Sequence, residues 1–220
     1  MDINIKGTIV NNDEKWLYDL FEIENTSPKD VFDVLSEANG MPVDVYINSG
    51  GGMVFAGSEI YTALRGYRGG VKIHVTGLAA SAASVIMCAG HCDISPTGMV
   101  MIHNVSGGAS GDYRDMEHEA AVLRTASKAL CAAYVEKTGR DETELLELMD
   151  QEKWFTAQEA VEMGLCDEIT GDNMQLVAAA SPVIPAVVIE KLKDIIANER
   201  KKAADMIAAV ERFAKLEAKV

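Results

Sequence analysis

The chain has 220 residues, of which 48% are hydrophobic and 25% are charged, as is typical of a soluble globular protein. Its 34 acidic and 20 basic residues give a net charge of −14, which disfavours binding to the phosphate backbone of nucleic acids. No stretch approaches the ~18 uninterrupted apolar residues of a membrane span, and the strand-like start MDINIKGTIV lacks the pattern of a signal peptide. We therefore expect a cytoplasmic protein that binds neither membranes nor nucleic acid.

Strand and helix patterns alternate through the first half of the chain. Strands are predicted over residues 3–10, 42–48, 70–77 and 98–105, and helices over 27–40, 53–67 and 82–90. The helix over 27–40 has the clearest ends, with Ser27 as the N-cap, Pro28 at the first helical position and Gly40 just past the last turn. This alternation predicts βαβ units and a mainly parallel sheet, hence an α/β fold.

The second half of the chain is predicted to be mostly helical up to Gly164. A long helix is predicted over about 112–138 and a shorter one over about 141–149. Thr156 and Glu159 form a capping box that starts a third helix, and Gly164 ends it. The run LCDEIT that follows predicts a last strand.

The composition changes after residue 170, and we divide the chain there into a domain, 1–170, a linker, 171–188, and a tail, 189–220. The linker holds the uncharged run AAASPVIPAVV with two prolines. The tail has apolar residues at three- and four-residue spacing, which predicts a helix that forms a coiled coil, docks on a partner or packs on its own domain. Residues 190–220 hold 8 basic and 6 acidic residues (+2), which leaves 12 basic and 28 acidic residues (−16) elsewhere.

The stretch VTGLAASAASVIMCAG, residues 75–90, consists largely of small residues and places Ser81 where a helix begins after a strand. The first N–H groups of a helix lack partners within the helix and carry partial positive charge. A nucleophile at this point therefore has donors beside it for the oxyanion that forms when a carbonyl is attacked. Close helix packing is the structural alternative for such a run.

A second segment, YINSGGGMVFAG, ends a strand with three consecutive glycines before another helix. Glycine lets the main chain approach a ligand closely, so N–H groups from this loop and from the residue after Ser81 can hold an oxyanion together. The loop has neither the G-x-G-x-x-G pattern nor the Gly-Lys-Ser/Thr ending of a phosphate-binding loop. Phosphate binding is therefore the weaker interpretation.

A serine nucleophile needs a general base within hydrogen-bond reach. Among the four histidines, His103 ends a strand and opens the loop NVSGGASG, whereas His74 lies within a strand and His118 lies among glutamates. His103 is the predicted base. An acid before WFTAQEA, either Asp150 or Glu152, is predicted to orient the imidazole.

The four cysteines show no disulfide framework in a chain of this size. Cys88, His91 and Cys92 stand close together, but a structural zinc site would need a fourth ligand from a partner pair that the sequence lacks. We predict no metal ion and no cofactor.

Four segments of the chain, taken together, resemble the serine peptidase family of the Clp proteolytic subunit: INSGGGMVFAGSEIYTAL, GLAASAASVIMCAG, MVMIHN and WFTAQEAVEMGLCDEI. They occur in the family's order, and the match covers about residues 3–170. They are more closely similar to the Clp-like branch among bacteriophage head-maturation (prohead) proteases. The resemblance implies the crotonase-like superfold of stacked βαβ units and hydrolysis of peptide bonds by a Ser-His-acid triad.

Transferred to this sequence, the resemblance implies that Ser81 is the nucleophile and His103 the base. The oxyanion donors fall on the backbone N–H groups of Gly51 and Ala82, with Gly52 beside them.

Two features depart from the family's pattern. Its Ser-Pro-Gly-Gly is Ser-Gly-Gly-Gly here, so that Gly50 loosens the turn without removing a donor. Its catalytic aspartate, counted back without gaps from WFTAQEA, falls on Glu152, whose side chain is longer. Asp150 is the alternative and needs a local shift.

The resemblance also implies partners. The loop 106–111 and the helix 112–138 resemble the handle through which the family's subunits face one another in rings, so we expect a homo-oligomer acting on polypeptide substrates. Prohead proteases often carry a scaffold-like C-terminal segment, so the tail favours the processing of capsid or scaffold proteins in the host cytoplasm or procapsid.

Three alternatives stay open at this point. One is a Clp-like housekeeping peptidase that works with an ATPase, and another is a catalytically silent assembly or scaffold protein. A crotonase-type acyl-CoA enzyme shares the superfold but needs no Ser-His pair, and the acidic composition suits CoA phosphates poorly.

Overall fold

The computed structural model describes residues 1–171, so the predicted linker, apart from its first residue, and the predicted tail lie outside the described residues. The strands of this part are β1 (Asp2–Ile9), β2 (Asn25–Thr26), β3 (Val43–Gly52), β4 (Val71–Ala80), β5 (His91–Ile94), β6 (Met99–Ile102), β7 (Lys153–Thr156) and β8 (Glu168–Ile169). Its helices are α1 (Lys15–Leu20), α2 (Pro28–Ala38), α3 (Val54–Gly66), α4 (Ala82–Met87), α5 (Tyr113–Thr138), α6 (Glu142–Asp150) and α7 (Ala157–Glu162). None of these helices is long and apolar enough to cross a membrane.

The strands form one sheet in the order β2-β1-β3-β4-β5-β8, and every neighbouring pair along this path is parallel. The sheet forks at β4: Lys72–Val75 pairs with β5, whereas Leu78–Ala80 pairs with β6. Strand β7 then runs antiparallel to β6. The α/β fold with a mainly parallel sheet, predicted from the alternating pattern, is confirmed.

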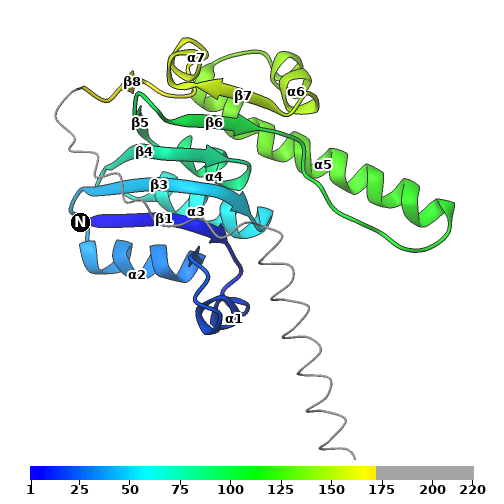
Figure 1. Ribbon diagram of the computed structural model, residues 1–220, viewed down its shortest axis with the longest axis horizontal. Helices are drawn as coiled ribbons and strands as arrows, with labels where there is room; N and C mark the ends of the chain where they lie inside the picture. The colour runs from blue at the N-terminus through cyan, green and yellow to red at the C-terminus, as the bar shows by residue number, and fades with distance from the viewer. Residues whose placement is uncertain (172–220) are drawn as a thin grey trace, which may run out of the picture. The chain divides into compact units, whose positions relative to one another are not determined.

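One face of the sheet carries the hydrophobic core. Along β1, β3 and β4 most odd-numbered residues are buried, among them Ile5, Val45 and Ile73. Helices α3 and α4 lie behind the sheet in the view of Figure 1. They pack closely against each other, because a Cβ added at Gly57 of α3 would come within 2.9 Å of the Ala82 Cβ in α4. This close packing brings together the β3–α3 and β4–α4 connections, which carry the predicted site.

Several element boundaries differ from the sequence predictions. The strand predicted over 42–48 continues through the glycines to Gly52, because they pair with β1. The helix predicted over 82–90 ends at Met87, and the strand predicted over 98–105 ends at Ile102. Four short elements, α1, β2, β5 and β7, were not predicted, because each has six residues or fewer and little periodicity of its own.

Helix α5 is anchored at its C-terminal end and projects away from the sheet at its N-terminal end (Figure 1). The Asp167 carboxylate accepts hydrogen bonds from the Cys92 N–H in β5 at 2.7 Å and from Lys137 Nζ in α5 at 2.5 Å. Burial acts to raise the pKa of Asp167, but these two hydrogen bonds and the Lys137 charge outweigh it, so the pKa is lowered. Asp167 therefore connects α5 to the sheet as a carboxylate.

We expect Asp167→Asn to lower the free energy of unfolding by about 1 kcal/mol near neutral pH. The expected effect is modest because the carboxylate is 37% exposed and water screens its charge. Since the pKa of Asp167 is lower in the folded state, the contribution is present above the unfolded value, ordinarily 3.8, and is lost as the pH falls through the folded value. Urea unfolding across this pH range measures the difference between the two proteins.

Asp33→Asn is the matched control, because Asp33 forms only an exposed ion pair with Lys29 and should contribute little at any pH. A difference for Asp167→Asn that stays constant into the acid range would contradict the proposed connection.

Candidate active site

Ser81 and His103 meet because they follow adjacent parallel strands. Ala80, the last residue of β4, pairs with Met101 of β6, and the Ser81 N–H donates to the Met101 carbonyl at 3.0 Å. The carboxyl ends of parallel neighbours lie at the same edge of a sheet. As a result, His103 Nε2 lies 2.7 Å from Ser81 Oγ. The structure thus brings together the nucleophile and the base that were predicted from the sequence.

The backbone of Ser81 is held in an uncommon conformation. Its φ of 56° and ψ of −126° lie outside the regions that residues with a Cβ ordinarily adopt, and such a conformation costs about 1–3 kcal/mol. Ser81 is the N-cap of α4, so the turn points its side chain out of the helix beside the first N–H groups. This matches the predicted position of Ser81 at the start of a helix.

The predicted oxyanion donors differ in what their N–H groups contact. The Gly51 N–H donates to Ser49 Oγ at 3.0 Å, and Gly51 is buried. Gly52 is exposed and has a φ of 152°, and the N–H of the next residue, Met53, donates to the Ile9 carbonyl of β1.

These contacts change which of the two glycines is the expected oxyanion donor. Gly52 lies at the pocket with Ser81, while Gly51 supplies the close packing, since a Cβ on Gly51 would come within 2.7 Å of the Ser81 Cβ. We accordingly move the expected donor from Gly51 to Gly52. Ala82 stays the second expected donor, as the first residue of α4.

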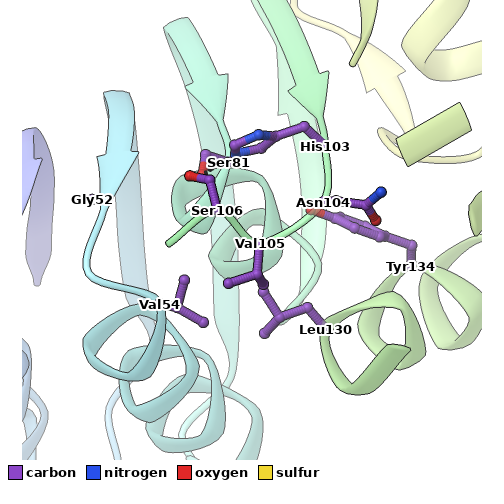
Figure 2. A pocket seen from close by; sticks show the side chains of 9 residues that line it. All are labelled: Gly52, Val54, Ser81, His103, Asn104, Val105, Ser106, Leu130 and Tyr134. Atoms are coloured by element: carbon purple, nitrogen blue, oxygen red, sulfur yellow. Dashed lines mark hydrogen bonds between the residues drawn. The ribbon is translucent and has the colours of Figure 1, made fainter. Parts of the chain in front are cut away.

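A pocket opens beside Ser81 and His103, as Figure 2 shows. Its other lining residues are Gly52, Val54, Asn104, Val105, Ser106, Leu130 and Tyr134. One wall is apolar and comes from α3, α5 and the segment after β6, and the opposite side holds the serine and the imidazole. The pocket thus offers an apolar surface next to the Ser81 hydroxyl.

The two candidate acids lie near the base without contacting it. Ile102 pairs with Lys153 in the antiparallel β6–β7 register, so Glu152 is the next residue opposite His103. Glu152 is exposed and has a φ of 49°. Asp150 accepts a hydrogen bond from Asn104 Nδ2 at 2.5 Å. Within residues 1–171, His103 has no hydrogen bond with a carboxylate.

The remaining histidines and the cysteines have other surroundings. His74 is buried between Asp93, 2.8 Å from its Nδ1, and Asp44, 3.2 Å from its Nε2. His91, at the start of β5, and His118, on α5, are exposed. The cysteines are free and buried, and within the described part no group of His, Cys, Asp and Glu has the arrangement of a metal site.

Sequence reasoning gave no role to three residues around the pair. Asn104 follows His103 and binds Asp150, whereas Ser84 and Tyr134 share a hydrogen bond of 2.7 Å behind Ser81. Ser84 was visible as the second hydroxyl in an apolar stretch, three residues after Ser81. Tyr134 had no comparable signal, because an aromatic residue on the inner face of a long helix is typical of a core position.

Two comparisons with known proteins bear on the family of the chain. The Clp protease family model matches residues 22–173. The chain belongs to the Clp protease family. It is also 30% identical over 155 residues to a protein of Salinibacter ruber named ATP-dependent Clp protease proteolytic subunit 1. The alignment spans 69% of this chain and 66% of the relative's length, just under two thirds.

The glycines of this Clp family member give a sharp test of the site's backbone. Gly52 has a φ of +152°, and a Cβ there would lie 2.1 Å from the Ile9 carbonyl oxygen, whereas a Cβ at Gly50 would meet nothing within 4 Å. We expect Gly52→Ala to lower the free energy of unfolding by about 3 kcal/mol and Gly50→Ala to change it by less than about 0.5 kcal/mol. Urea unfolding measures both variants, and equal losses would contradict the assigned backbone.

Proposed function

We propose that the protein is a serine endopeptidase in which Ser81 is the nucleophile and His103 the general base. The observation that carries this proposal is the 2.7 Å contact between Ser81 Oγ and His103 Nε2 at the N-terminus of α4. Membership of the Clp protease family supports the assignment to peptide-bond hydrolysis. The crotonase-type alternative uses no such pair.

The reaction follows from this geometry. His103 takes the Ser81 proton as Oγ attacks the carbonyl carbon of a peptide bond, which gives a tetrahedral intermediate and an imidazolium. His103 then protonates the leaving nitrogen, the C–N bond breaks and an acyl-enzyme remains. Water attacks the acyl-enzyme with His103 again as base, and the acid product leaves with Ser81 restored.

The oxyanion is assigned to the backbone N–H groups of Gly52 and Ala82. One lies at the end of β3 and the other at the start of α4, so the α3–α4 packing holds both donors beside Ser81. Each donor is expected to contribute roughly 3 kcal/mol of transition-state stabilisation, or about 10²–10³ in rate.

Glu152 is the proposed orienting acid. Its support is the β6–β7 register, which puts it opposite His103, and the engagement of Asp150 by Asn104. A carboxylate at this position would accept the Nδ1–H of His103 and stabilise the imidazolium.

The substrate is a polypeptide bound in extended form. The apolar wall of the pocket, formed by Val54, Val105 and Leu130, suits an uncharged apolar side chain next to the cleaved bond. The charge of −14 makes a strongly acidic substrate unfavourable.

A homo-oligomer is the proposed state of the enzyme. The projecting half of α5 exposes large apolar side chains, with Tyr113 71%, Met116 44% and Val122 45% exposed. Exposed apolar residues on a projecting helix are unfavourable in an isolated subunit, so contact with a second copy would stabilise them.

We propose further that the substrates are capsid or scaffold proteins and that the enzyme is a prohead protease. The support is the sequence resemblance and the helical pattern of residues 189–220, which suits recruitment into an assembling shell. The alternative is an enzyme fed by an ATPase, which the name of the Salinibacter ruber relative favours.

A fluorophosphonate probe tests the nucleophile directly. We expect it to label the folded protein on Ser81, as located by mass spectrometry, and labelling to be lost on heat denaturation and in Ser81→Ala. Ser81→Ala should abolish peptide hydrolysis with fold and assembly unchanged. In Ser84→Ala, which alters the neighbouring serine, the label should still be found on Ser81. Persistent hydrolysis by Ser81→Ala would refute the mechanism.

Cleavage assays with the wild-type protein distinguish the two substrate classes, namely capsid or scaffold proteins and proteins delivered by an ATPase. Cleavage of candidate capsid or scaffold proteins without nucleotide would support the prohead role, while cleavage only with an unfoldase and ATP would support the alternative. Labelling without any cleavage would leave the serine assignment intact and reject both substrate classes.

Glu152→Ala and Asp150→Ala separate the two acids. We expect Glu152→Ala to lower kcat by about 10²–10⁴, because the imidazole loses its orienting carboxylate, and Asp150→Ala to lower it far less. Hydrolysis rates and circular dichroism of both variants provide the measurement. The opposite order would assign the role to Asp150, and full activity in both would indicate a Ser-His dyad.

A further inference from the structure

Two buried hydroxyl groups lie directly behind the nucleophile. Ser84 Oγ donates to the Ser81 carbonyl at 2.6 Å and lies 2.7 Å from the Tyr134 hydroxyl. Ser84 is 0% exposed and Tyr134 is 2% exposed. A buried polar group is costly unless it is bonded, so the arrangement is a fixed part of the structure.

The direction of the bonds follows from counting protons. A serine hydroxyl has one proton, and Ser84 gives it to the Ser81 carbonyl. The Tyr134 hydroxyl must therefore be the donor to Ser84 Oγ. Burial raises the pKa of Tyr134, which keeps the phenol protonated and able to donate. The chain of bonds thus runs from α5 through α4 to the backbone of the nucleophile.

This chain of hydrogen bonds ends at Ser81, the residue with the strained backbone. The Ser81 conformation, with a φ of 56°, persists only if its surroundings hold it. Its carbonyl also accepts the Ser84 N–H at 2.9 Å, so Ser84 binds the same oxygen through both its backbone and its side chain. Loss of the side-chain bond would leave the carbonyl held by main-chain donors alone.

Tyr134 also reaches the pocket itself. Figure 2 shows its ring directed from α5 toward the pocket that Ser81 and His103 line. Its ring and its hydroxyl therefore contribute separately: the ring lines the pocket, and the hydroxyl contacts Ser84. A Tyr134→Phe variant keeps the first contribution and removes only the second.

We propose that Tyr134 and Ser84 are positioning residues for the serine nucleophile, with Tyr134 acting through Ser84 to hold the Ser81 backbone in its reactive conformation. This proposal rests on the proposed serine-hydrolase function. It assigns to the anchored half of α5 a role in the chemistry, in addition to packing. Hydrogen bonds in such a chain strengthen one another, so their contributions are coupled.

Inactivation by the fluorophosphonate probe measures this role without knowledge of the natural substrate. We expect Tyr134→Phe and Ser84→Ala each to lower the maximal inactivation rate roughly 5- to 20-fold while the probe concentration at half-maximal rate stays within about twofold. The double variant should be no slower than Ser84→Ala alone, because Tyr134 has no separate route to Ser81. A loss of packing alone would change probe binding or stability instead.

Tyr61→Phe is the matched control, since it also removes one phenol hydroxyl in contact with α5, where Tyr61 binds Glu136 at 3.1 Å, but away from the site. It should inactivate at the wild-type rate. Circular dichroism verifies the fold, and Ser84→Ala tests the same link if Tyr134→Phe does not fold. Multiplying effects in the double variant, or wild-type rates in both single variants, would overturn the inference. Absence of labelling in the wild type would instead reject the serine-hydrolase function.

Discussion

The parallel pairing of the last residues of β4 with β6 is the constraint on which the site depends. Ala80 opposite Met101 fixes where β4 ends relative to β6, and Ser81 and His103 follow from that register. A shift by one residue would turn every side chain of β6 to the other face of the sheet. The fork at β4 makes this pairing possible, because β5 takes the first half of β4 and leaves the second half free for β6.

The two glycines beside Ser81 differ in whether a side chain already occupies their backbone N–H. The Gly51 N–H donates to Ser49 Oγ, while Gly52 lines the pocket, and this difference is why Gly52 is the proposed oxyanion donor. No buried side-chain nitrogen or oxygen within residues 1–171 lacks a hydrogen bond. The strain at Ser81 is thus offset by a fully bonded surrounding, as expected for a residue kept in an uncommon conformation.

Sequence patterns predicted the alternating elements and the position of Ser81 at the start of its helix, because capping, glycine and periodicity are local features that a single sequence displays. The pairing of Ser81 with His103 was predicted from the need of a serine for a base and from the family resemblance, and the contact itself depends on the pairing of β4 with β6. Sequence patterns did not predict β7, whose four residues KWFT become a strand only by pairing with β6. Nor did they predict Tyr134, 50 residues from Ser84, because a contact between distant helices depends on packing rather than on any local signal. The proposed acid rests on both kinds of information, since the gap-free count of the family resemblance named Glu152 and the β6–β7 register makes it the residue opposite His103.

Within residues 1–171, the core lies on one side of the sheet, and this makes the anchoring of α5 important. Parallel sheets ordinarily have both faces covered, yet among the described residues no helix covers the face that carries Tyr46 and His74 (Figure 1). That face is polar instead, with His74 stacked on Tyr46 at 4.9 Å and bonded to Asp93. The core therefore lies on one side of the sheet, and the strands that carry Ser81 and His103 are supported from that side. Helix α5 adds support at the edge, where Lys137 binds Asp167 and where the Tyr134 hydroxyl contacts Ser84. A helix that projects away from the sheet at one end is thus bonded, at its other end, to both the sheet and helix α4.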